Sequence, residues 1–418
     1  MLSSRRPVRD RTLMILGLAL CHAAACGGPS RKVPTPERLQ ADALAHREAE
    51  HLQNERLTRV MLDRITAEHA AAPAGEQPDY DILMLSGGGE FGAFGAGVLY
   101  GWRAVTDRAL ARPEFDVVTG VSTGSLIAPF AFAGSDQEIQ HAENLYKEVP
   151  EDLAVLRGIL FFLPWRKSFF DTEGLDRTLH AEIGTEELSG MREGYAEHRM
   201  LLVGSTDLDL GVMHMWELGR EATQIQDDEQ ALTRIRLLLK ASTAIPAAFP
   251  PVEVDGHLNV DGGVAGTLFM DMEVIEAARR AIAADPAHPR PRLRLWVIVN
   301  GKIGAGIHGT QWTWPAVAER SSKTTMHFGM ATELRRLALF ARWLDAIGPL
   351  DVEFRYVAIP ESFEITGTPG HLFDHQLMIR LADLGEKMGR DSGSWRSSPP
   401  RPEELTPGID LPPEVAPR

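Results

Sequence analysis

The feature that most constrains the fold is a serine inside the pentapeptide GVSTG at residues 120–124. The apolar, partly β-branched segment 115–119 precedes it, and the sequence 125–131 can begin a helix directly afterwards. Glycines on both sides allow a tight turn between a strand and a helix, which lifts the hydroxyl of Ser122 clear of the backbone. The pattern predicts a nucleophile elbow, although a turn rich in glycine and serine is also a common plain connection.

A second glycine-rich turn, GGGEFG at residues 87–92, follows the apolar segment 82–85 and precedes a predicted helix. Backbone N–H groups in such a turn can stabilise a developing oxyanion. The same residues fit the dinucleotide-binding pattern G-x-G-x-x-G, which expects an acidic residue about 20 positions later, at the end of a second strand. Asp107 has that offset, but the segment 98–105 before it continues the helix. The sequence therefore favours an oxyanion hole over a nucleotide site, and we expect no cofactor.

The third motif is Asp261-Gly262-Gly263, which follows the alternating segment 257–260 and so lies at the predicted end of a strand. An aspartate there could accept the proton of a nucleophilic serine. By itself, Asp-Gly is typical of a turn.

Together, in this order and spacing, the three motifs resemble those of the patatin-like phospholipase family. The segment 241–251 is similar to the family's sequence before its aspartate, and 205–211 resembles its strand and turn between motifs. The resemblance covers roughly residues 80–300, with weaker similarity to about residue 390. It implies an α/β fold with three α/β/α layers around a mainly parallel sheet. It also implies a serine esterase that cleaves a lipid or phospholipid ester, of the phospholipase A or lysophospholipase type.

The resemblance further implies a serine–aspartate dyad, in which Ser122 attacks the ester carbonyl and Asp261 takes its proton. Partial burial of Asp261 would raise its proton affinity and make it a better base. Water would then hydrolyse the acyl-enzyme. The resemblance assigns the oxyanion hole to Gly87, Gly88, Gly89 and Thr123, and the other motif positions to Gly92, Gly120, Gly124, Gly262 and Gly263.

One departure from the family pattern bears on activity. Many members carry a basic residue where this chain has Phe91, and the neighbouring residue here is Glu90. A carboxylate about 6 Å from an oxyanion would repel it by ~3 kcal/mol at an effective dielectric of 20, which slows the reaction about a hundredfold. Glu90 could instead point to solvent. The alternative function is therefore a weakly active or inactive lipid-binding lipoprotein.

A Ser-His-Asp triad is the other catalytic alternative, because the chain has 14 histidines. His214 and His257 precede Asp261, whereas an α/β-hydrolase places its histidine last. The sequence has no H-E-x-x-H motif and no cluster at metal-ligand spacing, so we expect no catalytic metal. The histidines after Asp261, none in a distinctive setting, are His288, His308, His327, His371 and His375.

The N-terminus has the layout of a secretory signal, with arginines before the apolar run 13–20 and small residues before Cys26. Residues 24–27 resemble a bacterial lipobox, with Ala23 in place of the more usual leucine. That resemblance implies cleavage before Cys26 and its lipidation, and hence a periplasmic or outer-membrane lipoprotein of the cell envelope. Cleavage of a plain signal, followed by secretion, is the alternative.

Composition limits the partners and the sources of stability. The two cysteines, Cys21 and Cys26, lie in or beside the expected signal, so the mature chain has no pair for a disulfide. A chain of 418 residues that is 44% hydrophobic can supply its own core. The net charge of −15 argues against nucleic acid and predicts repulsion of the body from anionic lipid. The oligomeric state is left open.

The predicted helix over residues 36–70 has apolar residues at near-helical spacing, and we expect it to pack on the domain; a spacer or partner-binding helix is the alternative. The aromatic and basic segment 158–170 could be an acyl-chain pocket, a lid touching the bilayer, or buried core.

Seven prolines in residues 391–418 predict a disordered tail. The expected organisation is a signal at 1–25, lipidated cysteine and tether at 26–36, helix and linker at 37–78, catalytic core at 79–275, its continuation at 276–390, and the tail.

Overall fold

The computed structural model describes residues 31–73, 75–149, 155–156, 168, 170–285, 287–307, 309–366 and 373–400. The expected signal, the lipidation site Cys26, most of the segment 158–170 and the end of the tail lie outside the described residues. Within these ranges, no helix combines the length and the apolar character that a membrane crossing requires.

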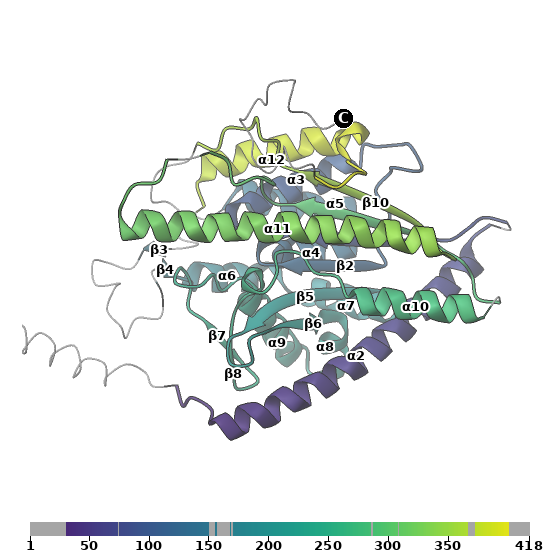
Figure 1. The fold of residues 1–418 in the computed structure, drawn as a ribbon, viewed down its shortest axis with the longest axis horizontal. Helices are drawn as coiled ribbons and strands as arrows, with labels where there is room; N and C mark the ends of the chain where they lie inside the picture. The colour runs from purple at the N-terminus through teal and green to yellow at the C-terminus, as the bar shows by residue number, and fades with distance from the viewer. Residues whose placement is uncertain are drawn as a thin grey trace, which may run out of the picture.

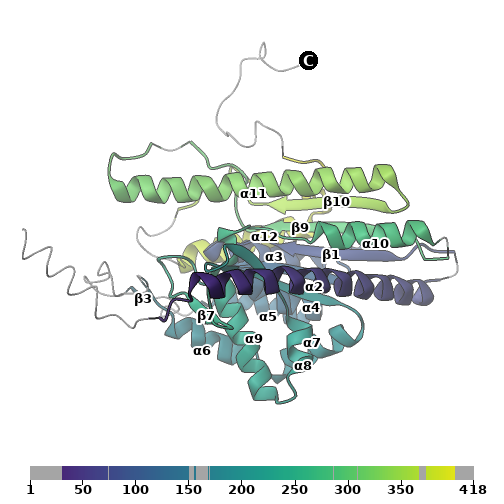
Figure 2. The ribbon, with the colours of Figure 1, turned by 60° about the horizontal axis from the view of Figure 1, so that its bottom comes forward.

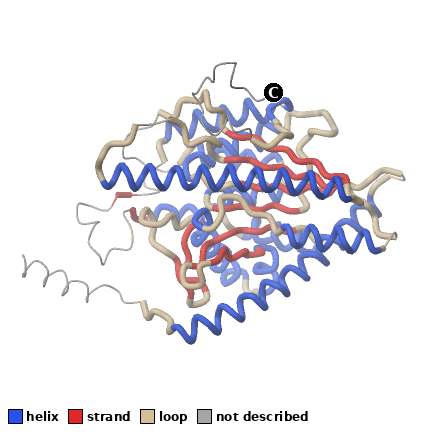
Figure 3. The backbone as a smooth tube through the Cα atoms, viewed as in Figure 1, coloured by secondary structure: helices blue, strands red, loops and turns tan. Residues whose placement is uncertain are grey.

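An eight-stranded sheet runs through the centre in the order β10-β9-β1-β2-β5-β8-β7, with β6 paired to β5 off this path. Its first five strands are parallel, and β6, β7 and β8 pair antiparallel. Figure 3 shows the strands in red among the blue helices. The parallel strands β1, β2, β5 and β9 are almost wholly buried, as expected where helices cover both faces. The strands are β1 Asp79–Leu85, β2 Val117–Val121, β5 Met200–Asp207, β6 Val212–Glu217, β7 Val252–Val254, β8 His257–Asp261, β9 Arg292–Val299 and β10 Asp351–Ala358, while β3 Val155–Leu156 and β4 Phe170–Asp171 form a separate pair.

Helices cover both faces of the sheet and enclose two hydrophobic clusters (Figures 1 and 2). One face packs against α2 Pro36–Ala71, α10 Met272–Ala284 and α11 Trp314–Ile347. The chain therefore has the three α/β/α layers and the mainly parallel sheet that its motifs predict. The helices on the other face are α3 Gly92–Trp102, α4 Thr123–Ala133, α5 Asp136–Lys147, α6 Glu173–Glu182, α7 Thr185–Ala196, α8 Leu218–Gln224, α9 Asp228–Ser242 and α12 His375–Arg390.

The N-terminal helix predicted over residues 36–70 is observed as α2. It starts at Thr35, whose hydroxyl accepts a hydrogen bond from the Arg38 N–H (3.3 Å). Leu57, Met61 and Ile65 recur every four residues and are buried against the sheet and α10. The C-terminal half of α2 thus packs on the domain, as the sequence predicts.

The prediction of a disordered tail from Asp391 onward is wrong for residues 391–400. Trp395 is buried, with its ring centroid 4.4 Å from that of Trp102 and 5.1 Å from that of Trp296. Arg396 then exchanges two backbone hydrogen bonds with Tyr356 on β10 (2.9 and 2.8 Å). The proline content of this segment is typical of a flexible chain, but burial of one indole ring is enough to fix its first turns.

Candidate active site

Ser122 occupies the turn between β2 and α4 and has φ 53° and ψ −125°. A positive φ at a residue other than glycine costs ~1–3 kcal/mol and persists only where the surroundings enforce it. The flanking glycines permit the turn. A Cβ on Gly120 would lie 2.5 Å from the Gly124 carbonyl oxygen, and one on Gly124 would lie 2.3 Å from that of Leu85. The pentapeptide therefore folds as a strained strand-to-helix elbow.

Ser242, the last residue of α9, holds this strained backbone in place. Its Oγ accepts a hydrogen bond from the Ser122 N–H (3.1 Å) and donates one to the Gly204 carbonyl on β5 (2.6 Å). Ser242 lies in the segment 241–251 that resembles the family sequence, and that resemblance implies no role for it. No local signal could reveal it, because the bond joins residues 120 positions apart.

Asp261 ends β8, where it pairs with Ser205 on β5, and β5 lies next to β2, the strand that ends just before Ser122. The Asp261 side chain is buried. Burial raises the pKa of its carboxyl to about 6, while interactions with the Ser122 hydroxyl and the Gly263 N–H (2.8 Å) oppose part of that rise. Within the described residues, its Oδ2 atom makes no hydrogen bond of normal geometry. The fold thus brings a serine hydroxyl and a partly basic carboxylate together.

The glycine turn lies against the nucleophile, because a Cβ built on Gly87 would be 3.3 Å from the Cβ of Ser122. The N–H of Gly87, however, donates a hydrogen bond to the carbonyl of Thr267 (3.1 Å). The prediction that Gly87 donates to an oxyanion is therefore wrong for this structure. Its N–H instead fastens the turn to the loop that follows Asp261.

The other expected donors are Gly88, Gly89 and Thr123. Across the ranges that the structure describes, no acceptor is hydrogen-bonded to their backbone N–H groups. Gly89 has φ 57° and opens a short 3-10 helix, Gly89–Phe91. Tyr146 holds the start of α4, since its hydroxyl contacts the Thr123 Oγ1 and donates to the Thr123 carbonyl (3.2 Å). Three unoccupied N–H groups therefore lie in the two turns beside Ser122.

Asn300, the residue after β9, supports the glycine turn from behind. Its N–H donates to the Ser86 Oγ (2.8 Å) and its Nδ2 donates to the Ser86 carbonyl (2.7 Å). The Ser86 Oγ donates in turn to the Gly87 carbonyl (2.8 Å). A Cβ on Gly88 would lie 2.0 Å from the Asn300 carbonyl oxygen, so the two backbones are in direct contact. The sequence analysis missed Asn300, which lies 214 residues from Ser86.

The two residues that departed from the family pattern are engaged elsewhere. Glu90 accepts hydrogen bonds from the N–H groups of Phe373 and Asp374, the second at 3.0 Å, at the start of α12. Burial is the main cause of the raised pKa of Glu90. A helix N-terminus favours a carboxylate. Phe91 packs against the hydrophobic core. The Glu90 carboxylate is thus held by the start of α12.

The two histidines considered for a catalytic triad, His214 and His257, contact other residues than Ser122. The Nδ1 of His257 lies 2.9 Å from the Asp207 carboxylate. His214 stacks on Trp216, and burial lowers its pKa to about 4. Among the described residues, no histidine hydrogen-bonds to Ser122 or to the carboxylate beside it. The geometry gives no support to a triad built on these side chains.

The ligand atoms of Asp207, Asp209 and His257 lie within 4.8 Å of one another. Their oxygens already have partners, since Asp209 pairs with Arg31 and Asp207 accepts from the N–H groups of Asp209 (2.8 Å) and Leu210 (3.0 Å). An arginine thus supplies the positive charge at this cluster, and the residues do not fit a bound metal ion well.

One family model matches the part of the chain that carries the three motifs. Residues 83–273 match the model of the patatin-like phospholipase family. Over 195 residues the chain is 29% identical to a cGAMP-activated phospholipase of Pseudomonas aeruginosa, an alignment that covers 45% of this chain and 54% of that protein. The chain thus spans about half the length of this curated relative. The crystal structure of VipD from Legionella pneumophila aligns over 76% of this chain and 68% of that one, with a TM-score of 0.35 and 15% identity.

Proposed function

The chain belongs to the patatin-like phospholipase family over residues 83–273, and on this basis we propose that it hydrolyses a carboxylic ester of a lipid. The observation that carries the proposal is the pairing of the strained Ser122 elbow with the buried carboxylate of Asp261. The family and the phospholipase relative support a phospholipid as substrate, with a reaction of the phospholipase A or lysophospholipase type.

In the proposed mechanism, the Ser122 oxygen attacks the ester carbonyl while Asp261 takes the hydroxyl proton. A carboxyl with a pKa of about 6 is ionised at neutral pH and is a stronger base than an ordinary aspartate. Negative charge then develops on the carbonyl oxygen, where the N–H groups of Gly88, Gly89 and Thr123 would bind it. One such donor is worth ~3 kcal/mol of transition-state stabilisation in a comparable protease.

The protonated Asp261 returns its proton to the departing alcohol when the tetrahedral intermediate collapses to the acyl-enzyme. A water molecule then attacks the acyl carbonyl as Asp261 takes a proton from it. As this second intermediate collapses, Asp261 returns that proton to the departing Ser122 oxygen, which releases the fatty acid and restores the Ser122 hydroxyl. Each proton taken by the carboxylate is thus given back within the same half-reaction.

A fluorophosphonate probe tests the nucleophile. We expect covalent labelling of the wild type and its loss in Ser122→Ala, together with a fall of at least about 10³-fold in ester hydrolysis. Ser189→Ala is a matched control, because Ser189 is exposed and its hydroxyl donates a hydrogen bond to Glu193 of its own helix (2.9 Å). Labelling of Ser122→Ala at the wild-type level would refute the proposed enzyme.

We also propose that the protein is a lipoprotein of the bacterial envelope, anchored through Cys26. The support is the signal-like sequence before Cys26 and its resemblance to a lipobox. Cells fed radiolabelled palmitate should incorporate it into the wild-type chain and not into Cys26→Ser. Equal incorporation in both chains would contradict this assignment.

A further inference from the structure

The outer side of α11 carries apolar side chains that no described residue covers. The helix is buried through Leu334, Leu337 and Leu344, and large apolar residues recur on the opposite side. Exposure is greatest where the helix begins, with Trp312 fully exposed and Trp314 82% exposed. A cluster of this kind on a protein surface indicates an interaction site. We call Ile307, Trp312, Trp314 and Val317 the aromatic tip.

The aromatic tip is fixed to the edge of the sheet where the active site lies. The loop after Asn300 continues from the residue that supports the glycine turn, and Arg320 of α11 donates to its Ala305 and Gly306 carbonyls (2.8 and 2.6 Å). His327 bonds to the Lys302 carbonyl in the same loop (2.9 Å). The first half of α11 is therefore hydrogen-bonded to the loop that follows the carboxyl end of β9.

A second connection runs from α11 to the glycine turn itself. The Glu333 carboxylate accepts hydrogen bonds from the Thr267 N–H (3.1 Å), the Thr267 hydroxyl (2.8 Å) and the Leu268 N–H (2.8 Å). The Thr267 carbonyl in turn accepts the N–H of Gly87. A single residue, Thr267, thus links the helix that carries the aromatic tip to the turn beside Ser122.

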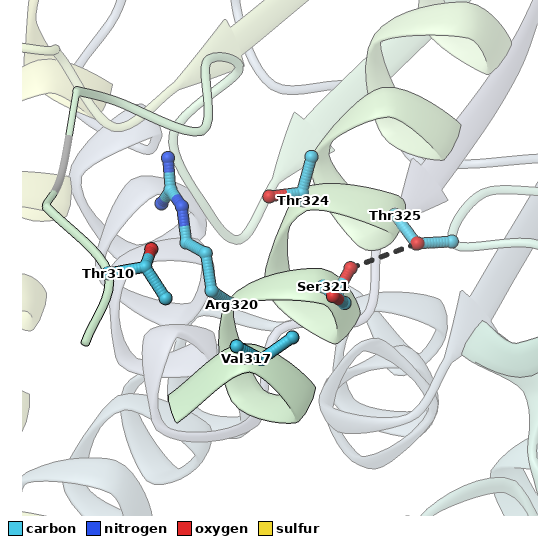
Figure 4. A pocket seen from close by; sticks show the side chains of 6 residues that line it. All are labelled: Thr310, Val317, Arg320, Ser321, Thr324 and Thr325. Carbon is cyan, nitrogen blue, oxygen red and sulfur yellow. Dashed lines mark hydrogen bonds between the residues drawn. The ribbon is translucent and has the colours of Figure 1, made fainter. Parts of the chain in front are cut away.

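Charge around the aromatic tip differs from that of the whole chain. Residues 300–330 contain Lys302, Arg320 and Lys323 against one acidic residue, Glu319, in a chain with a net charge of −15. Lys323 pairs with Glu319 (2.7 Å), and Glu361 from outside this segment accepts the Gly304 N–H (3.1 Å). A hollow of about 470 Å³ borders the tip (Figure 4). Its lining combines hydroxyl groups, an apolar side chain and a guanidinium, namely Thr310, Val317, Arg320, Ser321, Thr324 and Thr325.

This combination fits a phospholipid surface. Tryptophan prefers the boundary between acyl chains and headgroups, because its ring is apolar and its N–H is polar. Basic and hydroxyl groups beside it can meet phosphate oxygens. In Figure 1, α11 begins at the left of the molecule and α2 begins at its lower left.

We propose that the aromatic tip inserts into the surface of a phospholipid bilayer and turns the active-site edge toward it. This proposal rests on the proposed function, because only an enzyme that cleaves lipids needs its active-site edge to face a lipid surface. Insertion itself does not require Ser122, so binding and catalysis can fail separately.

Vesicle binding tests the insertion directly. The full chain carrying Cys26→Ser, which removes the expected acylation, is mixed with vesicles of three parts phosphatidylcholine to one part phosphatidylglycerol and sedimented. We expect Trp312→Gln/Trp314→Gln to lower the partition coefficient at least about tenfold, because two large aromatic surfaces no longer enter the bilayer. Trp343→Gln, an exposed tryptophan near the other end of the same helix, should stay within about twofold of the wild type.

Hydrolysis separates the docking surface from the proposed function. The Trp312/Trp314 variant should retain wild-type hydrolysis of a soluble p-nitrophenyl ester and lose hydrolysis of vesicle phospholipid in parallel with binding. Tip-dependent binding without any hydrolysis would refute the proposed function and leave the docking surface intact. Equal vesicle binding by wild type and variant would overturn the proposal. So would loss of a dimer in the variant at unchanged vesicle binding, because the tip would then join two copies of the chain.

Discussion

Replacing Asp261 with asparagine lowers kcat/KM for a lipid ester by ~10³-fold, because asparagine cannot accept the proton of the Ser122 hydroxyl. The change keeps the size and shape of the side chain. Asp255→Asn is the matched control, since Asp255 lies in the turn before β8, is largely exposed and pairs with Arg234. Steady-state kinetics on the three proteins measures the effect, and a fall of similar size in the control would assign the loss to disruption of the hairpin.

The pH dependence of the wild type follows from the same carboxyl. Its pKa is raised to about 6, so the base is ionised above that pH and protonated below it. We expect kcat/KM to rise with pH through about 6 and to level off above it. A profile that is flat between pH 5 and 7 would contradict the assignment of Asp261 as the base.

The raised pKa of Asp261 also affects the stability of the fold. Activity is expected to increase with pH, whereas the contribution of Asp261 to the free energy of unfolding decreases. An aspartate whose pKa is 3.8 when unfolded and about 6 when folded destabilises the folded state above pH 6, where both states are ionised, and has no such effect below pH 3.8. The shift corresponds to ~3 kcal/mol. Asp261→Asn should therefore unfold at higher denaturant concentration than the wild type at pH 8, and the gain should shrink at pH 4.

The second large effect is expected at Gly88. In Gly88→Ala the new Cβ would meet the Asn300 carbonyl oxygen at 2.0 Å, so the turn must move. Displacement of oxyanion donors by about 1 Å costs ~10²-fold in rate. Gly190→Ala is the control, because nothing lies within 4 Å of its Cβ and Gly190 lies in α7, outside the glycine turn. Kinetics on a soluble ester should show the larger loss in Gly88→Ala, and equal activities would contradict the role of this turn.

The sequence predicted the parts of the site that depend on local backbone geometry. The turn around Ser122, the glycine turn and the strand end at Asp261 each follow from a few adjacent residues, and their order carried the family resemblance. The bonds of Ser242, Asn300 and Glu333 could not be predicted, because each depends on the packing of elements distant in the sequence.

Two errors have the same physical origin. Gly87 has the residue type of an oxyanion donor, but the partner of its N–H is the Thr267 carbonyl, 180 residues later. Residues 391–400 have the composition of a tail, but Trp395 packs between two other tryptophans. Residue type and composition indicate which conformations and hydrogen bonds are possible for a segment. Tertiary contacts determine which of them the folded protein adopts.

The backbone of Ser122 has a consequence for laboratory evolution. Its φ of 53° is one that glycine adopts freely and serine does not. A selection for heat resistance that ignores activity should therefore enrich glycine at this position, together with uncharged residues in place of Asp261. A selection that retains activity should reject both changes and find its gains elsewhere in the chain.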